Sequence, residues 1–162
     1  MPASIIVSGP CMIQVDLGSG YVNLGQTDND NLPQISENDY THEIKTVSSG
    51  QAPEEIVVQG IDATVTATLV KWDATQLTAL RTRQRGAFNT ATIGRLLVAD
   101  NGTFAVKILP LTAGKTAYIF GRCFVPANGI VTSQFGNVEQ RAGLTFKAIP
   151  GVSGVLYTTA TT

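Results

Sequence analysis

The stretch Ile61-Asp-Ala-Thr-Val-Thr-Ala-Thr-Leu69 alternates strictly between apolar and polar residues. A period of two places successive side chains on opposite faces of an extended strand. The odd-numbered residues are therefore expected to face a core and the even-numbered ones to face water. The residues assigned to the wet face are Asp62, Thr64, Thr66 and Thr68.

The same alternation occurs near the end of the chain, over Ala142–Ile149, where Thr145 and Lys147 are expected to point outward. Apolar runs ending at glycine or proline predict further strands over Met12–Leu17, Tyr21–Leu24 and Lys115–Val125. Asp100-Asn101-Gly102, between two more apolar runs, is a typical hairpin turn. The fold class predicted from this pattern is mainly β, an antiparallel barrel or sandwich.

One flanking α-helix is predicted over about residues 74–85. Asp73 can cap its first turn, Gln76 stands where a capping box needs it, and Gly86 can end it. Ala74, Leu77 and Leu80 recur at helical spacing, so they are expected to pack on the barrel.

Residues 1–162 are expected to form a single domain, from which a long loop or hairpin at about residues 26–53 projects. The loop begins with an Asx-rich stretch that is too polar to fold alone, and Tyr40–Val47 then alternates like one arm of a hairpin. Long loops within compact domains are usually functional. Residues 26–47 are therefore expected to mediate assembly, and deleting residues 28–38 to leave a folded barrel that no longer stacks.

Charge is divided unequally along the chain. Residues 1–62 carry nine acidic side chains and one lysine, whereas residues 63–162 carry ten basic side chains and three acidic ones. Copies of such a chain can attract one another head to tail, which produces rings or stacks. The alternative is that the two halves neutralise each other within one fold.

Three arginines crowd the last turn of the predicted helix, where they complement the helix dipole or form a patch between subunits. The acidic loop is the natural partner of such a patch, and Arg95 and Arg141 are alternative partners. The candidates for contacts between subunits are Asp28, Asp30, Glu37, Asp39, Glu43, Arg81, Arg83 and Arg85.

No catalytic or metal site is expected. His42 is the only histidine, and Asp28-Asn29-Asp30-Asn31 lacks the glycine of a calcium loop because Pro33 occupies its sixth position. Cys11 and Cys123 stand among apolar neighbours, which favours two buried thiols over a disulfide. The chain is therefore interpreted as a non-enzyme without cofactors.

Two parts of the sequence resemble the tail tube (major tail) proteins of bacteriophages. The first is Glu54–Arg85, in which Val58-Gln-Gly-Ile-Asp-Ala-Thr-Val-Thr-Ala-Thr-Leu-Val-Lys-Trp72 precedes the helix. The second comprises Phe124-Val-Pro-Ala127, Gln134-Phe-Gly136 and Arg141-Ala-Gly-Leu-Thr-Phe-Lys-Ala-Ile149. The tube protein of type VI secretion systems is similar in fold and size.

The resemblance implies a virion structural protein whose hexameric rings stack into the tail tube, the conduit for genome delivery. Implied partners are further copies of the chain and possible sheath, tape-measure and baseplate or terminator proteins, with DNA passing through unbound and no membrane involved. The implied location is the phage tail, after assembly in the host cytoplasm. No signal peptide is expected, because no basic region precedes Ile5–Val7.

The channel of such a tube is expected to be hydroxyl-rich, since sliding DNA should not meet phosphate-binding groups. Alternatively, Thr64, Thr66 and Thr68, which are candidates for this lining, simply face solvent outside the barrel. Other classes left open are a baseplate or capsid-decorating protein, a type VI tube subunit and a carbohydrate-binding sandwich. The candidate channel-lining residues are Asp62, Thr64, Thr66, Thr68 and Thr145.

Overall fold

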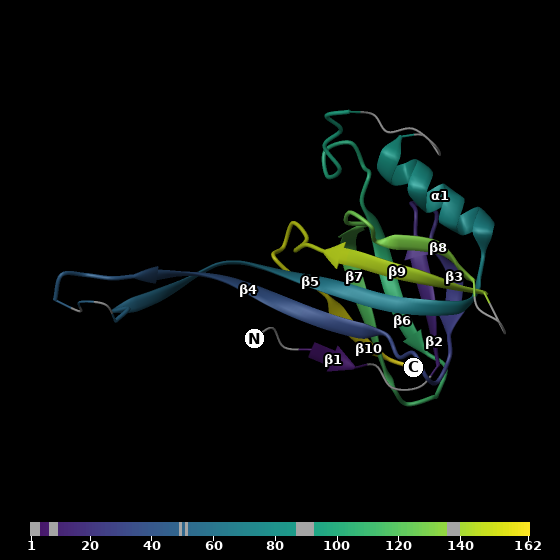
Figure 1. The fold of residues 1–162 in the computed structure, drawn as a ribbon, viewed down its shortest axis with the longest axis horizontal. Coiled ribbons are helices and arrows are strands. Elements are labelled where there is room, and N and C mark those ends of the chain that lie inside the picture. Colours follow the sequence, from purple (N-terminus) through teal and green to yellow (C-terminus); the bar gives the residue numbers. More distant parts are fainter. Residues whose placement is uncertain (1–3, 7–9, 49, 51, 87–92, 136–139) are drawn as a thin grey trace.

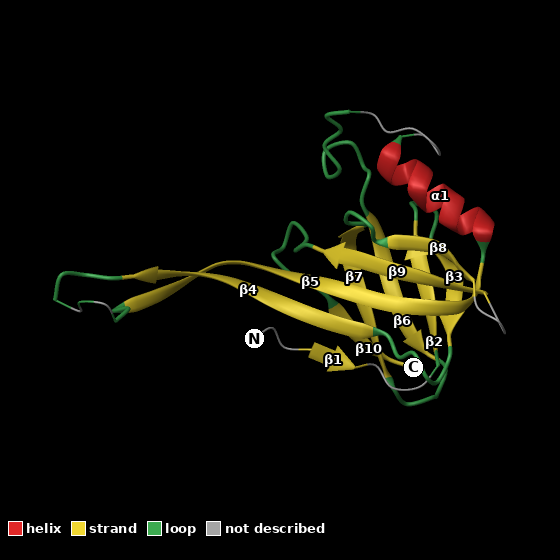
Figure 2. Cartoon of the chain, viewed as in Figure 1, coloured by secondary structure: helices red, strands yellow, loops and turns green. Residues whose placement is uncertain are grey.

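The structure, a computed structural model, describes residues 4–6, 10–48, 50, 52–86, 93–135 and 140–162. Within these residues, five strands precede a single helix and five strands follow it (Figures 1 and 2). All strand pairs within these residues are antiparallel, as expected. The elements are β1 (Ser4–Ile6), β2 (Cys11–Asp16), β3 (Tyr21–Thr27), β4 (Gln34–Ile44), β5 (Glu55–Trp72), α1 (Ala74–Arg85), β6 (Phe104–Pro110), β7 (Thr116–Phe124), β8 (Ile130–Phe135), β9 (Gln140–Ala148) and β10 (Thr158–Thr161).

Six strands close into a barrel. The hydrogen-bonded order runs β5-β3-β2-β6-β7-β9, and β9 pairs again with β5 through the register Ala63↔Ala148 to Leu69↔Ala142. Closure removes the exposed edges of these strands. The remaining strands lie outside this ring: β4 on β5, β1 on β4, β8 on β9 and β10 on β7.

The core of the barrel consists of the inward positions predicted from the alternation. Ala63, Val65, Ala67 and Leu69 are buried, and they face the buried residues of β2, β6 and β9. Phe104 and Phe146 meet edge to face, with ring centroids 5.6 Å apart. The half-buried strand at Ile61–Leu69 is therefore confirmed.

A close approach between β3 and β5 explains one glycine. The register of this pair shifts between Gln26 and Thr27, so the strands cross tightly there. A Cβ on Gly25 would lie 2.5 Å from the carbonyl oxygen of Lys71 and 2.6 Å from Leu69 Cδ1. Any larger residue at this position would push the two strands apart.

Helix α1 begins and ends where its caps predict. The Asp73 carboxylate accepts hydrogen bonds from the backbone N–H of Thr75 and of Gln76, at 2.8 and 3.2 Å. Gly86 ends the helix with a φ of 87° and donates to the carbonyl of Thr82. The Asp73 N–H donates to the carbonyl of Leu24, which ties the helix start to β3.

The buried face of α1 is narrower than the sequence predicted. Leu77 and Leu80 are buried, but Ala74 is exposed, so the apolar face of the helix meets the barrel only from Leu77 onward. Polar anchors complete the attachment instead. The Gln84 side chain exchanges two hydrogen bonds with the backbone of Val125, at 2.7 and 2.8 Å.

The hairpin predicted around Asp100-Asn101-Gly102 was wrong in its first half. Residues 93–103 form turns, and only Phe104–Pro110 is a strand. The Asp100 carboxylate accepts from the Leu96 N–H, and the Asp100 N–H donates to the Leu96 carbonyl, so the backbone of the first apolar run is held in a turn. Both cysteines are buried thiols, as the favoured interpretation had it.

Candidate assembly surfaces

A two-stranded arm projects from the barrel (Figure 1). Among the described residues it comprises 39–48, 50 and 52–61, in which the ends of β4 and β5 pair from Asp39↔Ile61 to Ile44↔Glu55. The sequence predicted a projecting loop or hairpin at about residues 26–53, with Tyr40–Val47 as one arm; in the structure β4 already begins at Gln34. The strand forms because β5 supplies a hydrogen-bonding edge along its whole length.

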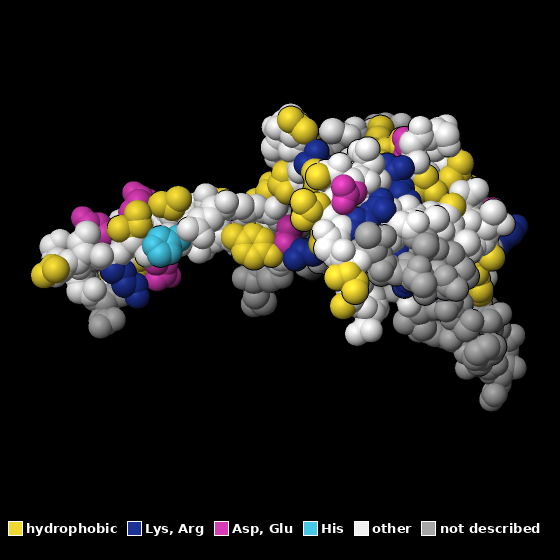
Figure 3. Space-filling model, turned by 90° about the horizontal axis from the view of Figure 1, so that it is seen from above, with side chains coloured by type: hydrophobic (Ala, Val, Ile, Leu, Met, Phe, Trp, Pro, Cys, Tyr) yellow, Lys and Arg dark blue, Asp and Glu magenta, His cyan; other side chains and the backbone are white. Residues whose placement is uncertain are grey.

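Apolar side chains of the arm are exposed. Their exposed fractions are 54% for Ile56, 43% for Val57 and 63% for Val58, whereas the inward residues of the same strand inside the barrel are buried. Figure 3 shows the arm standing clear of the body with apolar and acidic side chains along it. A two-stranded ribbon without a core is marginally stable by itself.

The register sorts the arm into two faces, because cross-strand partners point to the same side. A bulge between Tyr40 and Thr41 shifts the pairing, which then runs Thr41↔Val58, His42↔Val57, Glu43↔Ile56 and Ile44↔Glu55. One face, here called the acidic face, carries acids on β4 beside an apolar row on β5. Its residues are Asp39, Thr41, Glu43, Ile56, Val58 and Ile61.

The root of the arm is held by Asp62, which the sequence had placed on a wet face. Asp62 is in fact buried, at 5% exposure. Its carboxylate accepts hydrogen bonds from Asn38 Nδ2 at 2.8 Å and from the Tyr40 hydroxyl at 2.5 Å, and pairs with Lys147 Nζ at 2.8 Å. Burial alone would raise the pKa of Asp62, but the hydrogen bonds from Lys147, Tyr40 and Asn38 lower it below its ordinary value.

The remaining channel-lining candidates form one outer wall of the barrel. Thr66 pairs with Thr145 across β5 and β9, and Thr64 and Thr68 lie on the same face of β5. The basic residues that β9 adds to this face within the described residues are both paired with acids: Lys147 with Asp62, and Arg141 with Asp28 at 3.4 Å. The wall is therefore polar, with its cations partly neutralised.

These two ion pairs also bear on the charge division. Each joins an acid of the first 62 residues to a base of the remainder, so part of the division is internal neutralisation. Asp28 further accepts from the backbone N–H of Asp30 and of Asn31, which closes a turn. Burial would raise the pKa of Asp28, but the bonds from Asn31 and the charge of Arg141 hold it below its ordinary value.

The other acidic candidates divide between the barrel and the arm. Glu37 is half-buried and bonded to Tyr157, whose pKa it raises together with burial. Asp30 lies in the exposed turn after β3, and Asp39 and Glu43 are exposed on the acidic face of the arm. The structure therefore does not bring the five acids together into one patch.

The three helix arginines are separated by their contacts. Arg83 is used within the chain, since its guanidinium donates to the carbonyls of Thr103 and Leu17 at 2.6 Å each. The alternative candidate Arg95 donates to the carbonyls of Arg83 and Asp100 at 3.0 Å each. Arg81 has no hydrogen-bond or ion-pair partner among the described residues, and its Nε is buried.

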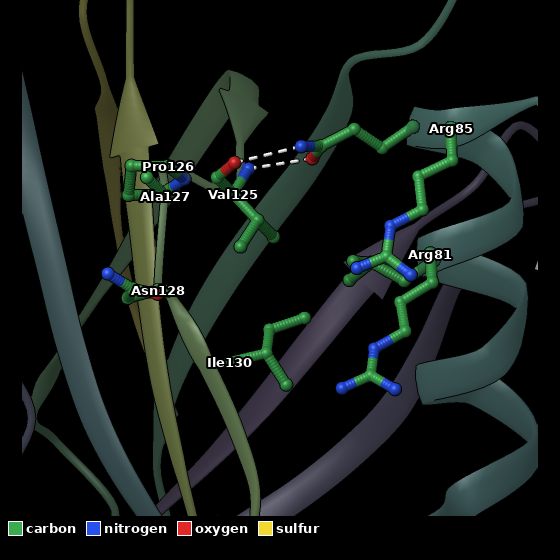
Figure 4. A pocket seen from close by; sticks show the side chains of 10 residues that line it. Arg81, Arg85, Val125, Pro126, Ala127, Asn128 and Ile130 are labelled. Carbon is green, nitrogen blue, oxygen red and sulfur yellow. Dashed lines mark hydrogen bonds between the residues drawn. The ribbon is translucent and has the colours of Figure 1, made fainter. Parts of the chain in front are cut away.

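Arg81 and Arg85 line a groove of about 430 Å³ between α1 and the segment that joins β7 to β8. Figure 4 shows both side chains extending from the helix on the side of Ile130, below the dashed Gln84–Val125 hydrogen bonds. Burial, together with the neighbouring charge of Arg85, lowers the pKa of Arg81. Apolar side chains complete the lining: Leu80, Val125, Pro126, Ala127 and Ile130.

The described residues contain no group of three or more histidine, cysteine or acidic side chains that could hold a metal ion. Burial raises the pKa of the Cys11 thiol to about 11 and that of Cys123 to about 12, so both are protonated near neutral pH. The helix in the described part of the chain, α1, lacks the length and apolar character needed to cross a membrane.

No protein-family model matches the sequence, and no curated protein matches it either. A solved structure does match. A chain of the structure titled "Virion of native gene transfer agent (GTA) particle" superposes with a TM-score of 0.55 at 13% sequence identity, over 93% of this chain and 95% of that chain. This protein has the fold of that virion chain over almost its whole length.

Proposed function

We propose that this protein is a structural subunit of a phage-like virion, and that six copies form rings that stack into a tail tube. The shared fold with a chain of a virion particle supports the first part. The resemblance of residues 54–85 and 124–149 to tail tube proteins supports the second. The proposal includes no catalytic role and no cofactor.

The observation that carries the proposal is the uncovered arm. Its apolar side chains on both faces, among them Ile56, Val57 and Val58, have no core beneath them within the described residues. Covering such surface releases about 25 cal/mol for each Å² removed from water. A second copy of the chain provides that cover in an assembly and gives the marginal ribbon a partner.

The position of the arm favours rings and stacks over a closed pair. The arm projects from one side of the barrel and α1 lies toward the other (Figure 1). An arm that docks on a different surface of the next copy makes a heterologous contact. Such contacts repeat from copy to copy, and they close into rings or continue as stacks.

The polar wall of β5 and β9 is the proposed channel lining. Thr64, Thr66, Thr68 and Thr145 present hydroxyl groups there, and Lys147 and Arg141 are paired with acids. Phosphate groups of passing DNA would therefore meet few unpaired cations, which keeps salt-dependent binding weak. Sheath, tape-measure and baseplate or terminator proteins are further proposed partners, and the virion tail, assembled in the host cytoplasm, is the proposed location.

Negative-stain microscopy of the purified protein at rising concentration tests the proposal. The wild-type chain is expected to form rings and tubes with a central hole. A variant in which Asn-Gly joins Tyr40 to Gly60 shortens the arm to a two-residue turn and keeps the Asp62 cluster. This variant should keep its melting temperature within a few degrees and form no tubes.

Deletion of residues 28–38 is a poorer test than the sequence suggested. It would remove Ile35, which is fully buried, and the residues of β4 that pair with β1. Loss of tubes in that variant would therefore reflect a damaged barrel. Long tubes formed by the Asn-Gly variant would contradict an assembly role for the arm, and a wild-type chain that stays monomeric would contradict the tube.

A further inference from the structure

We infer that the groove between α1 and residues 125–130 receives the acidic face of the arm of a second copy, with Glu43 meeting Arg81 and Ile56 meeting the apolar wall. This inference rests on the proposed self-assembly, and it identifies the two surfaces that meet. It follows from the contacts of the candidate arginines, from the matched pattern of the two surfaces, and from their positions in the fold.

The groove contains a cation, Arg81, that can pair with an incoming acid. Of the candidate arginines, Arg83, Arg95 and Arg141 are engaged within the chain, by backbone carbonyls or by Asp28. Arg85 is not free either. Arg81 has no partner among the described residues, and a buried Nε without an acceptor is costly. A carboxylate arriving in the groove would pair with the guanidinium of Arg81 and offset the repulsion between Arg81 and Arg85.

The arm carries the complementary pattern. Glu43 and Ile56 are cross-strand partners, so a carboxylate and a branched apolar side chain lie side by side on one face. The groove likewise places Arg81 opposite Pro126 and Ile130. Its volume of about 430 Å³ suits a few inserted side chains rather than the whole ribbon.

Glu43 remains available for such a contact. Its ion pair with Lys45, at 3.6 Å, is long and exposed, and such a pair contributes little. Glu55 stands at the same level of the arm but points to the opposite face, because it pairs with Ile44. Glu43 and Glu55 therefore form a matched pair of acids that differ in the face they occupy.

The two surfaces cannot meet within one chain, since the arm points away from the side of the barrel that carries α1 (Figure 1). Each copy then offers one arm and one groove. The contact is heterologous, in agreement with head-to-tail growth.

Cross-linking tests which side chains meet. Chains with Glu43→Cys and with Arg81→Cys are mixed and treated with a short bis-maleimide, since a glutamate–arginine contact spans more than a disulfide allows. The native Cys11 and Cys123 are buried and should stay unreacted. We expect a cross-linked dimer from this mixture and none from the matched mixture of Glu55→Cys with Arg81→Cys.

Charge exchange tests the energetics. Arg81→Glu and Glu43→Arg should each raise the protein concentration needed for tube formation by about fivefold at low salt, and less as salt rises. The two changes combined in one chain should restore it to within about twofold. Glu55→Arg and Lys115→Glu, which make the same charge changes on surfaces away from the contact, should have no effect.

Because Arg81 is half-buried, Arg81→Gln is made alongside, and the melting temperature of every variant is measured. Tubes that form with no Glu43–Arg81 cross-link and no rescue in the double variant would overturn this docking and leave the proposed tube intact. A wild-type chain that forms neither assemblies nor cross-links would overturn both.

Discussion

Strand β5 passes through two environments. From Ile61 to Leu69 it has the barrel core on one side, and Val65 is fully buried there. From Glu55 to Gly60 the same strand keeps its hydrogen-bonded partner β4 but has no core, and Val58 is 63% exposed. Strand β4 pairs with both regions, but from Ala63 to Leu69 the other edge of β5 also pairs with β9, whereas the arm has β4 as its only strand partner among the described residues.

This difference separates the region whose apolar side chains are buried within the single chain from the region whose apolar side chains stay exposed. Apolar side chains in the barrel stabilise the single chain, because folding removes them from water. The apolar side chains of the arm gain nothing comparable until another molecule covers them. Substitutions in the two regions should therefore separate folding from assembly.

The largest expected difference is between two isoleucines on the paired strands. Ile35→Ala, at a fully buried site on β4, should reduce the free energy of unfolding by about 2–5 kcal/mol. Ile56→Ala, at a 54% exposed site on the arm, should leave the stability of the monomer almost unchanged and weaken assembly. Urea unfolding and light scattering measure the two effects. Equal losses of stability would show that the arm is already packed in the free chain.

The next largest loss of stability is expected in the Asp62 cluster, which lies at the junction of the two regions. Asp62→Asn should cost about 1–3 kcal/mol at neutral pH, because Lys147 would keep its charge without a partner. The pKa of Asp62 in the folded chain lies below 3.8, so the carboxylate stabilises the fold above about pH 4. That contribution is lost as the pH falls through the folded-state pKa.

The same ion pair raises the pKa of Lys147 above 10.5, so its contribution is also lost as the pH rises through that higher value. Melting temperatures of the wild type and of Asp62→Asn, compared from pH 2 to 7, should converge at the acid end. A constant difference between the two proteins across that range would contradict a stabilising Asp62 carboxylate.

A smaller effect is expected at the helix that borders the groove. Asp73→Ala removes the acceptor for the backbone N–H groups of Thr75 and Gln76, and should cost about 1 kcal/mol of stability. Asp73→Ser, which keeps a capping oxygen, should recover most of this loss in thermal melts. A loss of tubes with an unchanged melting temperature would place Asp73 in an interface instead.

The smallest effect is expected in the ion pair of the arm. Lys45→Ala breaks an exposed contact of 3.6 Å with Glu43 and should produce no measurable change in the melting temperature. This contrasts with Lys147→Ala, which should destabilise the barrel. A clear destabilisation by Lys45→Ala would mean that the arm contributes to the folding of the single chain.

Much of the barrel and the helix could be predicted from local sequence. Ala63, Val65, Ala67 and Leu69 recur at every second position. A strand with this repeat places all four on one face, and burial of that face fixes the strand register. The caps Asp73 and Gly86 act within one turn of the chain, so their neighbours in sequence are their partners in space. Ala74 was placed wrongly, because which turns of a helix meet the barrel is not a local property.

The pairing of charges was decided by the tertiary structure. Local sequence grouped Arg81, Arg83 and Arg85 together, but the fold brings the carbonyls of Leu17 and Thr103 to Arg83 and leaves Arg81 facing a groove. Likewise Asp62 belongs by alternation to a wet face, yet Asn38, Tyr40 and Lys147 enclose it. The residues in these contacts are 20 or more positions apart in the sequence. At such separations, strand register and barrel closure decide which residues meet.

The sequence by itself determined the elements of this protein: antiparallel strands, one capped helix and a polar segment too long for a turn. Only the tertiary structure decided that β4 and β5 run past the barrel together and expose Ile56 and Val58. The reason is physical. Period and capping are set by neighbouring residues, whereas burial depends on what the rest of the chain, or another chain, places on each face.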